Sequence, residues 1–179
     1  EIKNENGQSV LYAAVASGEY YGTHESLPSD GLFRSVDYGD SWEQVLPNII
    51  GSDVPYTPSD IEITSNGRIF IGTMKNLNGD GGATILYSDT GLSHSWNIYD
   101  DYIDIIESDN SHPIPGRVRL GSSLSNGNIV YAIIGSGYLN GNDFNLSNGN
   151  YILKSTNGGS SWNTMPLPTE EGSDWASLA

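Results

Sequence analysis

Short apolar runs separated by turn-forming residues recur along the chain, and they predict antiparallel β-strands. The clearest set of four lies near 60–64, 68–72, 83–87 and 96–99. A second set of four is expected near 117–122, 128–134, 150–155 and 162–165, and a set of three near 10–16, 31–35 and 42–46. No segment shows a helical period over a useful length, so we expect an all-β chain.

One kind of turn occurs three times, opened by a serine and closed by a tryptophan. The three copies read SVDYGDSW at 35–42, SDTGLSHSW at 88–96 and STNGGSSW at 155–162. We refer to them as the first, second and third serine–tryptophan turns. Each lies between two apolar runs and should join two antiparallel strands. Their tryptophans are 54 (42 to 96) and 66 (96 to 162) residues apart, and a period of roughly 40 to 50 residues plus insertions is typical of four-stranded propeller blades.

The residue types of these turns favour a structural role over ligand contact. Asp37 or Asn157, two residues after the serine, can accept hydrogen bonds from backbone N–H groups that the turn leaves free. Gly39 and Gly159 can supply the positive φ that a tight turn needs. Each tryptophan then enters the next strand, where its ring can bury on the order of 200 Å² beneath the turn.

At these residues the chain resembles the Asp-box repeat family, whose pattern is S-x-D-x-G-x-[ST]-W. The first turn matches at Ser35, Asp37, Gly39, Ser41 and Trp42. The third has Asn157 in place of the aspartate and otherwise matches at Ser155, Gly159, Ser161 and Trp162. The second is degenerate, with Ser88, Asp89 one position early, Gly91, Ser95 and Trp96.

The resemblance implies a β-propeller, because the family carries this turn between the third and fourth strands of its blades. Such boxes are found in sialidases, xyloglucan-active endoglucanases and sortilin-type receptors, so they indicate a fold and not a chemistry. We therefore expect an all-β fold of about three four-stranded blades. The whole chain, 1–179, is read as a single propeller segment with blade one at 8–50, blade two at 59–100 and blade three at 116–166.

Blade one shows only three strands in the sequence, so its innermost strand is expected to be missing from the start of the chain. The segment 173–179 is similar to the opening of blade two and is one candidate to complete it. Three blades are too few to close a ring, since propellers have about four to eight. The chain is then either part of a larger propeller, the interpretation we favour, or a unit that another copy of itself completes.

The charge balance excludes some partners. There are 22 acidic and 7 basic residues, a net charge of −15, and the basic residues are scattered. Nucleic acid is not expected because a phosphate backbone needs clustered Lys and Arg, and no apolar run is long enough for membrane insertion. The turn-rich composition fits an acidic bacterial-type protein that is secreted or held at the cell surface, and the absence of cysteine says nothing about the compartment.

Long loops are expected on the face opposite the serine–tryptophan turns, and binding sites usually lie on such loops. They carry a dense carboxylate cluster that includes Asp100, Asp101 and Asp104, which is either solvated loop charge or a calcium site. No other cofactor and no histidine metal site is expected. Aromatic residues in or beside the loops could stack on sugar rings or could pack the loops themselves: Tyr20, Tyr21, Tyr138 and Phe144.

These observations predict a binding or scaffold module without catalytic residues of its own, whose ligand face is the long acidic loops and whose partner is a carbohydrate or another protein. The alternative is part of a glycan-degrading glycoside hydrolase of the endoglucanase kind, which would need two positioned carboxylates. A sialidase is disfavoured, because only four arginines are present and the Arg-Ile-Pro motif of that family is absent.

Overall fold

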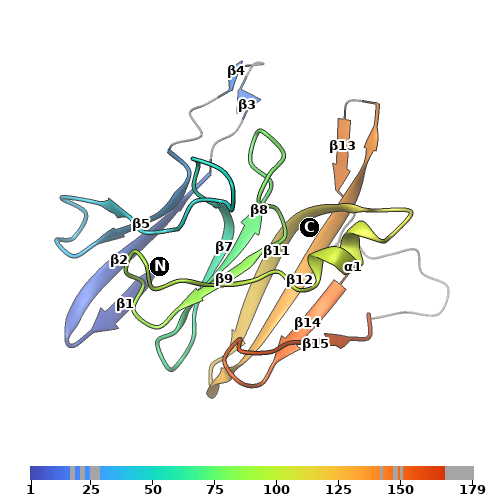
Figure 1. Ribbon diagram of the computed structural model, residues 1–179. Coiled ribbons are helices and arrows are strands. Elements are labelled where there is room, and N and C mark those ends of the chain that lie inside the picture. The colour runs from blue at the N-terminus through green and yellow to red at the C-terminus, as the bar shows by residue number, and fades with distance from the viewer. Residues whose placement is uncertain are drawn as a thin grey trace.

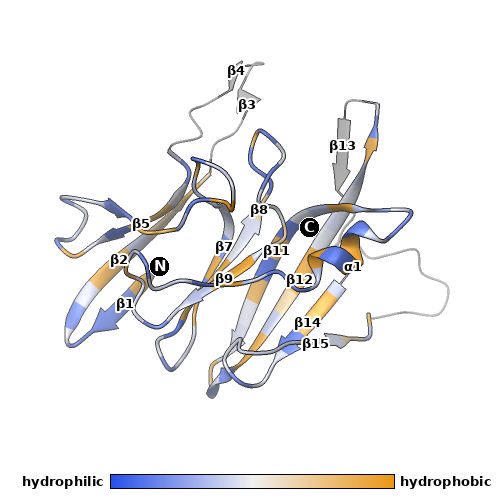
Figure 2. Cartoon of the chain, viewed as in Figure 1, coloured by the Kyte–Doolittle hydropathy of each residue, from blue (hydrophilic) through white to orange (hydrophobic). Residues whose placement is uncertain are grey.

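A computed structural model describes residues 1–16, 29–141, 149 and 151–167, together with the backbone alone of 19–20, 23–24 and 143–146 (Figure 1). The described chain is built from antiparallel strands and one short helix, so the prediction of an all-β chain is confirmed. Hydrophobic stretches are seen on strands such as β9 and β14, and hydrophilic ones on the loop that follows β8 (Figure 2).

The first four-stranded sheet has the order β1 (Ile2–Glu5), β2 (Gln8–Val15), β5 (Gly31–Ser35) and β6 (Glu43–Gln44). We call it the first meander. The expectation that its first strand is missing was wrong, because β1 pairs with β2 along its whole length. Asn6 and Gly7 form the connecting turn with φ of 54° and 88°. Asn-Gly is a strong hairpin signal, but β1 contributes only one apolar residue and so went unnoticed.

Two further meanders follow. The second consists of β7 (Thr57–Ile63), β8 (Ile69–Met74), β9 (Ile85–Ser88) and β10 (Asn97–Tyr99), and the third of β11 (Ile114–Ser123), β12 (Asn126–Asn140), β14 (Tyr151–Ser155) and β15 (Asn163–Met165). A single pair, Arg117 with Met74, joins β11 to β8, so that the two meanders and the short strand β13 (Asp143–Leu146) form one curled nine-stranded sheet (Figure 1).

Four elements lie inside segments that were expected to be loops. Strands β3 (Glu19–Tyr20) and β4 (Thr23–His24) form a small hairpin, and β13 (Asp143–Leu146) pairs with the end of β12. Part of the segment between the strands expected at 128–134 and 150–155 is therefore a hairpin formed by β12 and β13. Helix α1 (Ile103–Glu107) occupies the loop after β10, and its single turn and a half is too short to show a period in the sequence.

The second meander is buried on both faces. One apolar core fills the space between the first and second meanders and includes Ile69, Ile71 and Leu86. The other fills the space between the second and third and includes Phe70 and Ile85. Neighbouring residues of β8 thus point into different cores, which explains why that strand is continuously apolar and does not alternate.

The strands β7 and β11 are held together by polar contacts where the second and third meanders meet. Ser59 Oγ donates to the carbonyl of Val118 at 2.7 Å, and Asp60 Oδ2 accepts from the backbone N–H of Leu120 at 2.8 Å. A Cβ on Gly72 of the neighbouring strand β8 would come within 2.8 Å of the Val118 carbonyl oxygen. Only glycine allows this close approach.

The first and third serine–tryptophan turns share one hydrogen-bond network. Ser35 Oγ accepts from the N–H of Gly39 at 2.9 Å, and Asp37 Oδ1 accepts from the N–H of Ser41 at 2.9 Å. The indole N–H of Trp42 donates to the Gly39 carbonyl at 3.0 Å. The equivalent bonds in the third turn are 2.8, 3.0 and 3.1 Å. The network satisfies backbone groups that a tight turn would leave unpaired.

Asparagine can take the place of aspartate in the third turn because one side-chain hydrogen bond runs in the opposite direction. In the first turn Ser41 Oγ donates to Asp37 Oδ2 at 2.5 Å, whereas in the third Asn157 Nδ2 donates to Ser161 Oγ at 2.8 Å. A serine hydroxyl can do either, because it is both donor and acceptor. The two residues therefore give the same turn with different charge.

The second turn is built differently. Ser88 Oγ lies 2.6 Å from Ser95 Oγ, so the two hydroxyls bond without an intervening carboxylate. Asp89 instead forms an ion pair with the Arg68 guanidinium, with contacts of 2.6 and 2.9 Å. The aspartate of this turn, one position earlier than in the others, therefore binds a side chain of the connection between β7 and β8 and not the serine of its own turn.

The second and third turns each pack on the meander that precedes them. A Cβ on Gly91 would come within 2.3 Å of the Tyr12 hydroxyl, and a Cβ on Gly159 within 2.6 Å of the Phe70 ring. Trp162 also packs edge-on against Phe70, with ring centroids 6.2 Å apart. The turns therefore connect neighbouring meanders as well as neighbouring strands.

We expect Gly159→Ala to destabilise the fold by about 1–3 kcal/mol more than Gly7→Ala. The two glycines have nearly equal φ, +87° and +88°, so both substitutions carry the same backbone strain. Only Gly159 has a neighbour in the way, since nothing lies within 4 Å of a Cβ on Gly7. Urea denaturation of both variants measures the difference, and equal destabilisation would show that the contact with Phe70 carries no weight.

The Asp37 carboxylate should contribute stability that is lost in acid. Hydrogen bonds from the Ser41 hydroxyl, the Ser41 backbone and Ser35 lower its pKa from 3.8 to about 2. A lowered folded-state pKa stabilises the fold above about pH 4, and this contribution disappears as the pH falls through 2.

The test is the melting temperature of Asp37→Asn between pH 6 and pH 2. The difference in melting temperature between the wild type and Asp37→Asn should stay constant above pH 4. Towards pH 2 the wild type should lose more of its stability than the variant does. Asp40→Asn is the matched control, because the Asp40 side chain makes no hydrogen bond within the described turn. The same pH dependence in both variants would contradict the assignment.

Candidate functional site

A pocket of about 500 Å³ opens where three segments meet above the junction of the second and third meanders. They are the segment before β7, the loop between β8 and β9, and the loop that contains α1. In antiparallel meanders these connections lie at the strand ends opposite the serine–tryptophan turns. The pocket is therefore on the face where the sequence analysis placed the ligand.

The first wall is a tight loop with a buried apolar side. The N–H of Ile49 donates to the Val54 carbonyl at 2.9 Å, and the N–H of Tyr56 donates to the Pro47 carbonyl at 3.2 Å. Ile49 and Tyr56 are buried in the core between the first and second meanders. The same two side chains line the pocket, so this wall is anchored directly on the core.

The second wall requires glycine. Asn76 Oδ1 accepts from the N–H groups of Asn78 and Asp80 at 2.8 and 2.9 Å and folds the loop back on itself. A Cβ on Gly81 would come within 2.7 Å of Ile49, and one on Gly82 within 2.7 Å of the Pro115 and Gly116 carbonyl oxygens at the start of β11. The backbone can line the pocket because these positions have no side chain.

The third wall is α1 and the residues before it. Tyr102 is buried and donates its hydroxyl to the Ala83 carbonyl, which connects this wall to the second one. Burial raises the pKa of Tyr102 well above its usual value, so the hydroxyl stays a proton donor. The side chain of Ile106, on the inner side of α1, is fully buried. Ile103 and Glu107, four residues apart on one helix face, line the pocket.

The three aspartates of the cluster predicted from the sequence do not come together in one site. Asp100 lines the pocket, whereas Asp101 and Asp104 are exposed and do not. No group of three or more His, Asp or Glu among the described residues is arranged to hold a metal ion. The geometry therefore gives no support to calcium at these three aspartates.

The lining of the pocket combines carboxylates with apolar side chains. Its carboxylates are Asp80, Asp100 and Glu107. Burial raises the pKa of the Tyr56 phenol, and the nearby charge of Asp100 raises it further. No lysine or arginine is among the lining residues, but Lys75 lies against the second wall and interacts with the charge of Asp80. Asp100 and Glu107 would still disfavour an anion, while a cation or a neutral molecule rich in hydroxyl groups would find acceptors.

None of the predicted aromatic residues with a described side chain lines this pocket. Tyr138 lies outside it on β12 and packs edge-on against His112, with ring centroids 5.4 Å apart. The side chains of Tyr20 and Phe144 and the whole of Tyr21 lie outside the described residues. Sequence reasoning missed Tyr56 and Ile103 as lining residues. The spacing of Ile103 and Glu107 was the one signal available, and it required knowing that α1 is a helix.

Comparison with known proteins gives no assignment: no protein-family model matches the chain, and no curated protein matches its sequence. In the part of the chain that the structure describes, no helix has the length and apolar character needed to cross a membrane.

We expect Tyr102→Phe to destabilise the protein by about 1–2 kcal/mol, because it leaves the buried Ala83 carbonyl without its hydroxyl partner. Tyr99→Phe is the matched control, since the neighbouring Tyr99 packs on Tyr102 but its hydroxyl makes no hydrogen bond with the described residues. Urea unfolding of both variants measures this, and equal effects would show that the hydroxyl bond does not hold α1 in place.

Proposed function

We propose that the chain is an Asp-box β-propeller segment that acts as a non-catalytic binding module, secreted or at the cell surface. The observation that carries the binding role is the pocket formed by three loops on the face opposite the turns. The propeller interpretation is supported by the three successive four-stranded meanders. It is also supported by the position of each serine–tryptophan turn, between the third and fourth strand of its meander.

The ligand class that fits the pocket best is a carbohydrate without acidic groups. Asp80, Asp100 and Glu107 offer carboxylate acceptors to sugar hydroxyls, and Thr84 and Ser52 add hydroxyl groups. Apolar side chains such as Ile103 and Pro115 offer surface to the C–H faces of a sugar ring. Walls anchored on buried residues keep the pocket preformed, which lowers the entropic cost of binding.

A glycan array followed by calorimetry tests this proposal. Asp100→Asn and Glu107→Gln should each weaken binding of a captured neutral glycan by about tenfold, the typical value of one charge-assisted hydrogen bond. Asp101→Asn is the matched control, since Asp101 is a neighbouring carboxylate that does not line the pocket. Binding that is unchanged in all three variants, or no glycan captured by the wild type, would refute the assignment.

A glycoside hydrolase is the alternative, and one observation favours it. Asp100 and Glu107 line the same pocket, and glycoside hydrolysis uses two carboxylates on either side of the scissile bond. Release of reducing sugar from a β-glucan, abolished in both Asp100→Asn and Glu107→Gln, would favour this function over simple binding. Binding without release favours the module.

A further inference from the structure

The three meanders have equivalent positions, and these positions define two faces on each. The strand residue opposite the turn serine is Leu11, Ile69 or Val130. We call the side of the sheet to which it belongs the near face. The next residue of the same strand, Tyr12, Phe70 or Tyr131, points to the other side. We call that side the far face.

Within the chain, the far face of one meander always packs against the near face of the next. Tyr12 shares a core with Ile69, and Phe70 shares a core with Val130. The turn of the following meander covers each aromatic residue, so Tyr12 is 3% exposed and Phe70 is 0% exposed. The same type of contact is therefore made twice.

The far face of the third meander lacks such a cover among the described residues. Tyr131, the counterpart of Tyr12 and Phe70, is 40% exposed. Ile133 and Ile152, paired across β12 and β14, belong to the same face and are only partly buried. The counterparts of Ile152 in the other meanders, Leu32 and Ile85, are both fully buried.

Within the described part of the chain, the near face of the first meander is uncovered in the same way. Leu11 and Phe33 are half-buried, whereas their counterparts in the second and third meanders are buried in the cores. Trp42 is 44% exposed. A Cβ on Gly39 would meet only Trp42 and Leu11 of its own meander, unlike Gly91 and Gly159, which touch the preceding one. The first turn therefore has room for an aromatic ring.

We infer that these two faces bind each other between copies of this chain, so that the far face of the third meander in one copy receives the near face of the first meander in the next. Each face is the missing half of a contact that the chain already makes twice. Tyr131 has Lys154 beside it, 5.4 Å from its ring centroid, just as Tyr12 has Arg34 bonded to its hydroxyl. The third meander thus offers the same aromatic and cationic pair that receives the second turn.

Charge also favours this pairing. The first turn carries Asp37 and Asp40, and Lys154 supplies a positive charge on the facing surface.

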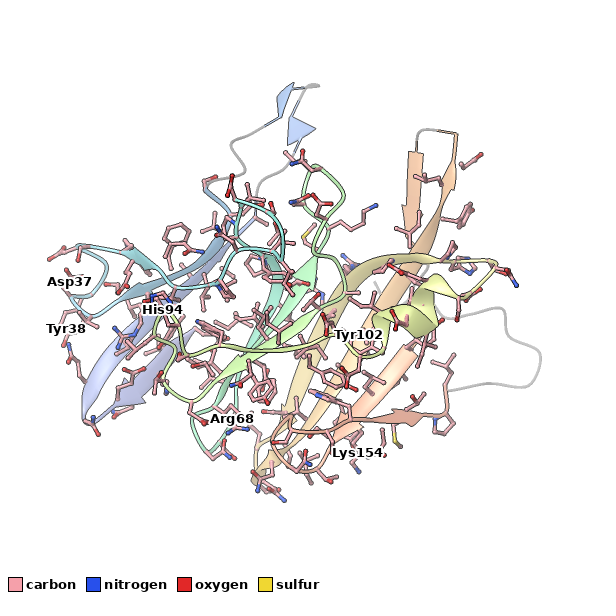
Figure 3. The ribbon with its side chains drawn as sticks, viewed as in Figure 1. Asp37, Tyr38, Arg68, His94, Tyr102 and Lys154 are labelled. Carbon is pink, nitrogen blue, oxygen red and sulfur yellow. The ribbon has the colours of Figure 1, made fainter. Side chains whose placement is uncertain are left out.

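Tyr38 and Lys154 lie on opposite sides of the molecule (Figure 3). The contact is therefore head-to-tail, and such contacts close into rings or extend into filaments. Closure of two copies into a six-bladed ring rests on the propeller arrangement proposed above, whereas the contact itself rests only on the repeated packing.

Sedimentation and light scattering over a range of concentrations test the association. The wild type should reach twice 19.3 kDa or a larger multiple of it. Tyr131→Glu should weaken this association by about 30-fold or more, as for the loss of a central interface aromatic. Tyr138→Glu is the matched control, since Tyr138 is also on β12 and 41% exposed but belongs to the opposite end of the strand. Circular dichroism checks that both variants fold.

Cross-linking tests the orientation, because the chain has no cysteine of its own. Two single variants, Tyr38→Cys and Lys154→Cys, are mixed and oxidised. Disulfides should form between the two different variants and at a much lower level within either one alone. Tyr38→Cys mixed with Tyr138→Cys is the control and should not cross-link. A monomer at all concentrations, an association unaffected by Tyr131→Glu, or cross-links within Tyr38→Cys alone would overturn the inference, whatever the pocket binds.

Discussion

The packing of each meander against the far face of the one before it is the constraint on which the rest of the structure depends. Phe70 illustrates it: the ring is covered by Gly159 and Trp162 of the third turn and contacts Tyr87 of its own sheet. Two apolar cores result, with the second meander between them. The hydrogen bonds of the turns matter because they fix the glycine and tryptophan that make this contact.

The same packing determines where a ligand can bind. One end of the stacked sheets is closed by the turns, whose backbone groups are largely hydrogen-bonded within the turns themselves. At the other end the chain must connect strands across the junctions, and there Gly81 and Gly82 bring the backbone close to its neighbours. The pocket lies at this end because the connections are long enough to form walls and are anchored on core residues such as Ile49 and Tyr102.

The sequence predicted strands well where their residues are buried and predicted the site only in outline. The strands of the second meander were found because its apolar runs are continuous, and β1 was missed because it lies at an edge and needs few apolar residues. The long acidic loops were located, but the division of Asp100 from Asp101 and Asp104 depends on α1, whose position is set by Tyr102 and Ile106 in the core. Such tertiary contacts leave no local pattern.

Burial of β8 on both faces has a consequence for synthesis of the chain. Ile69 and Ile71 can be covered once the first meander has formed, but Phe70 waits for the third turn, about ninety residues further along the chain. During translation the growing polypeptide therefore exposes an apolar strand for several seconds at ordinary elongation rates. Over that interval the face of β8 that carries Phe70 is exposed to aggregation.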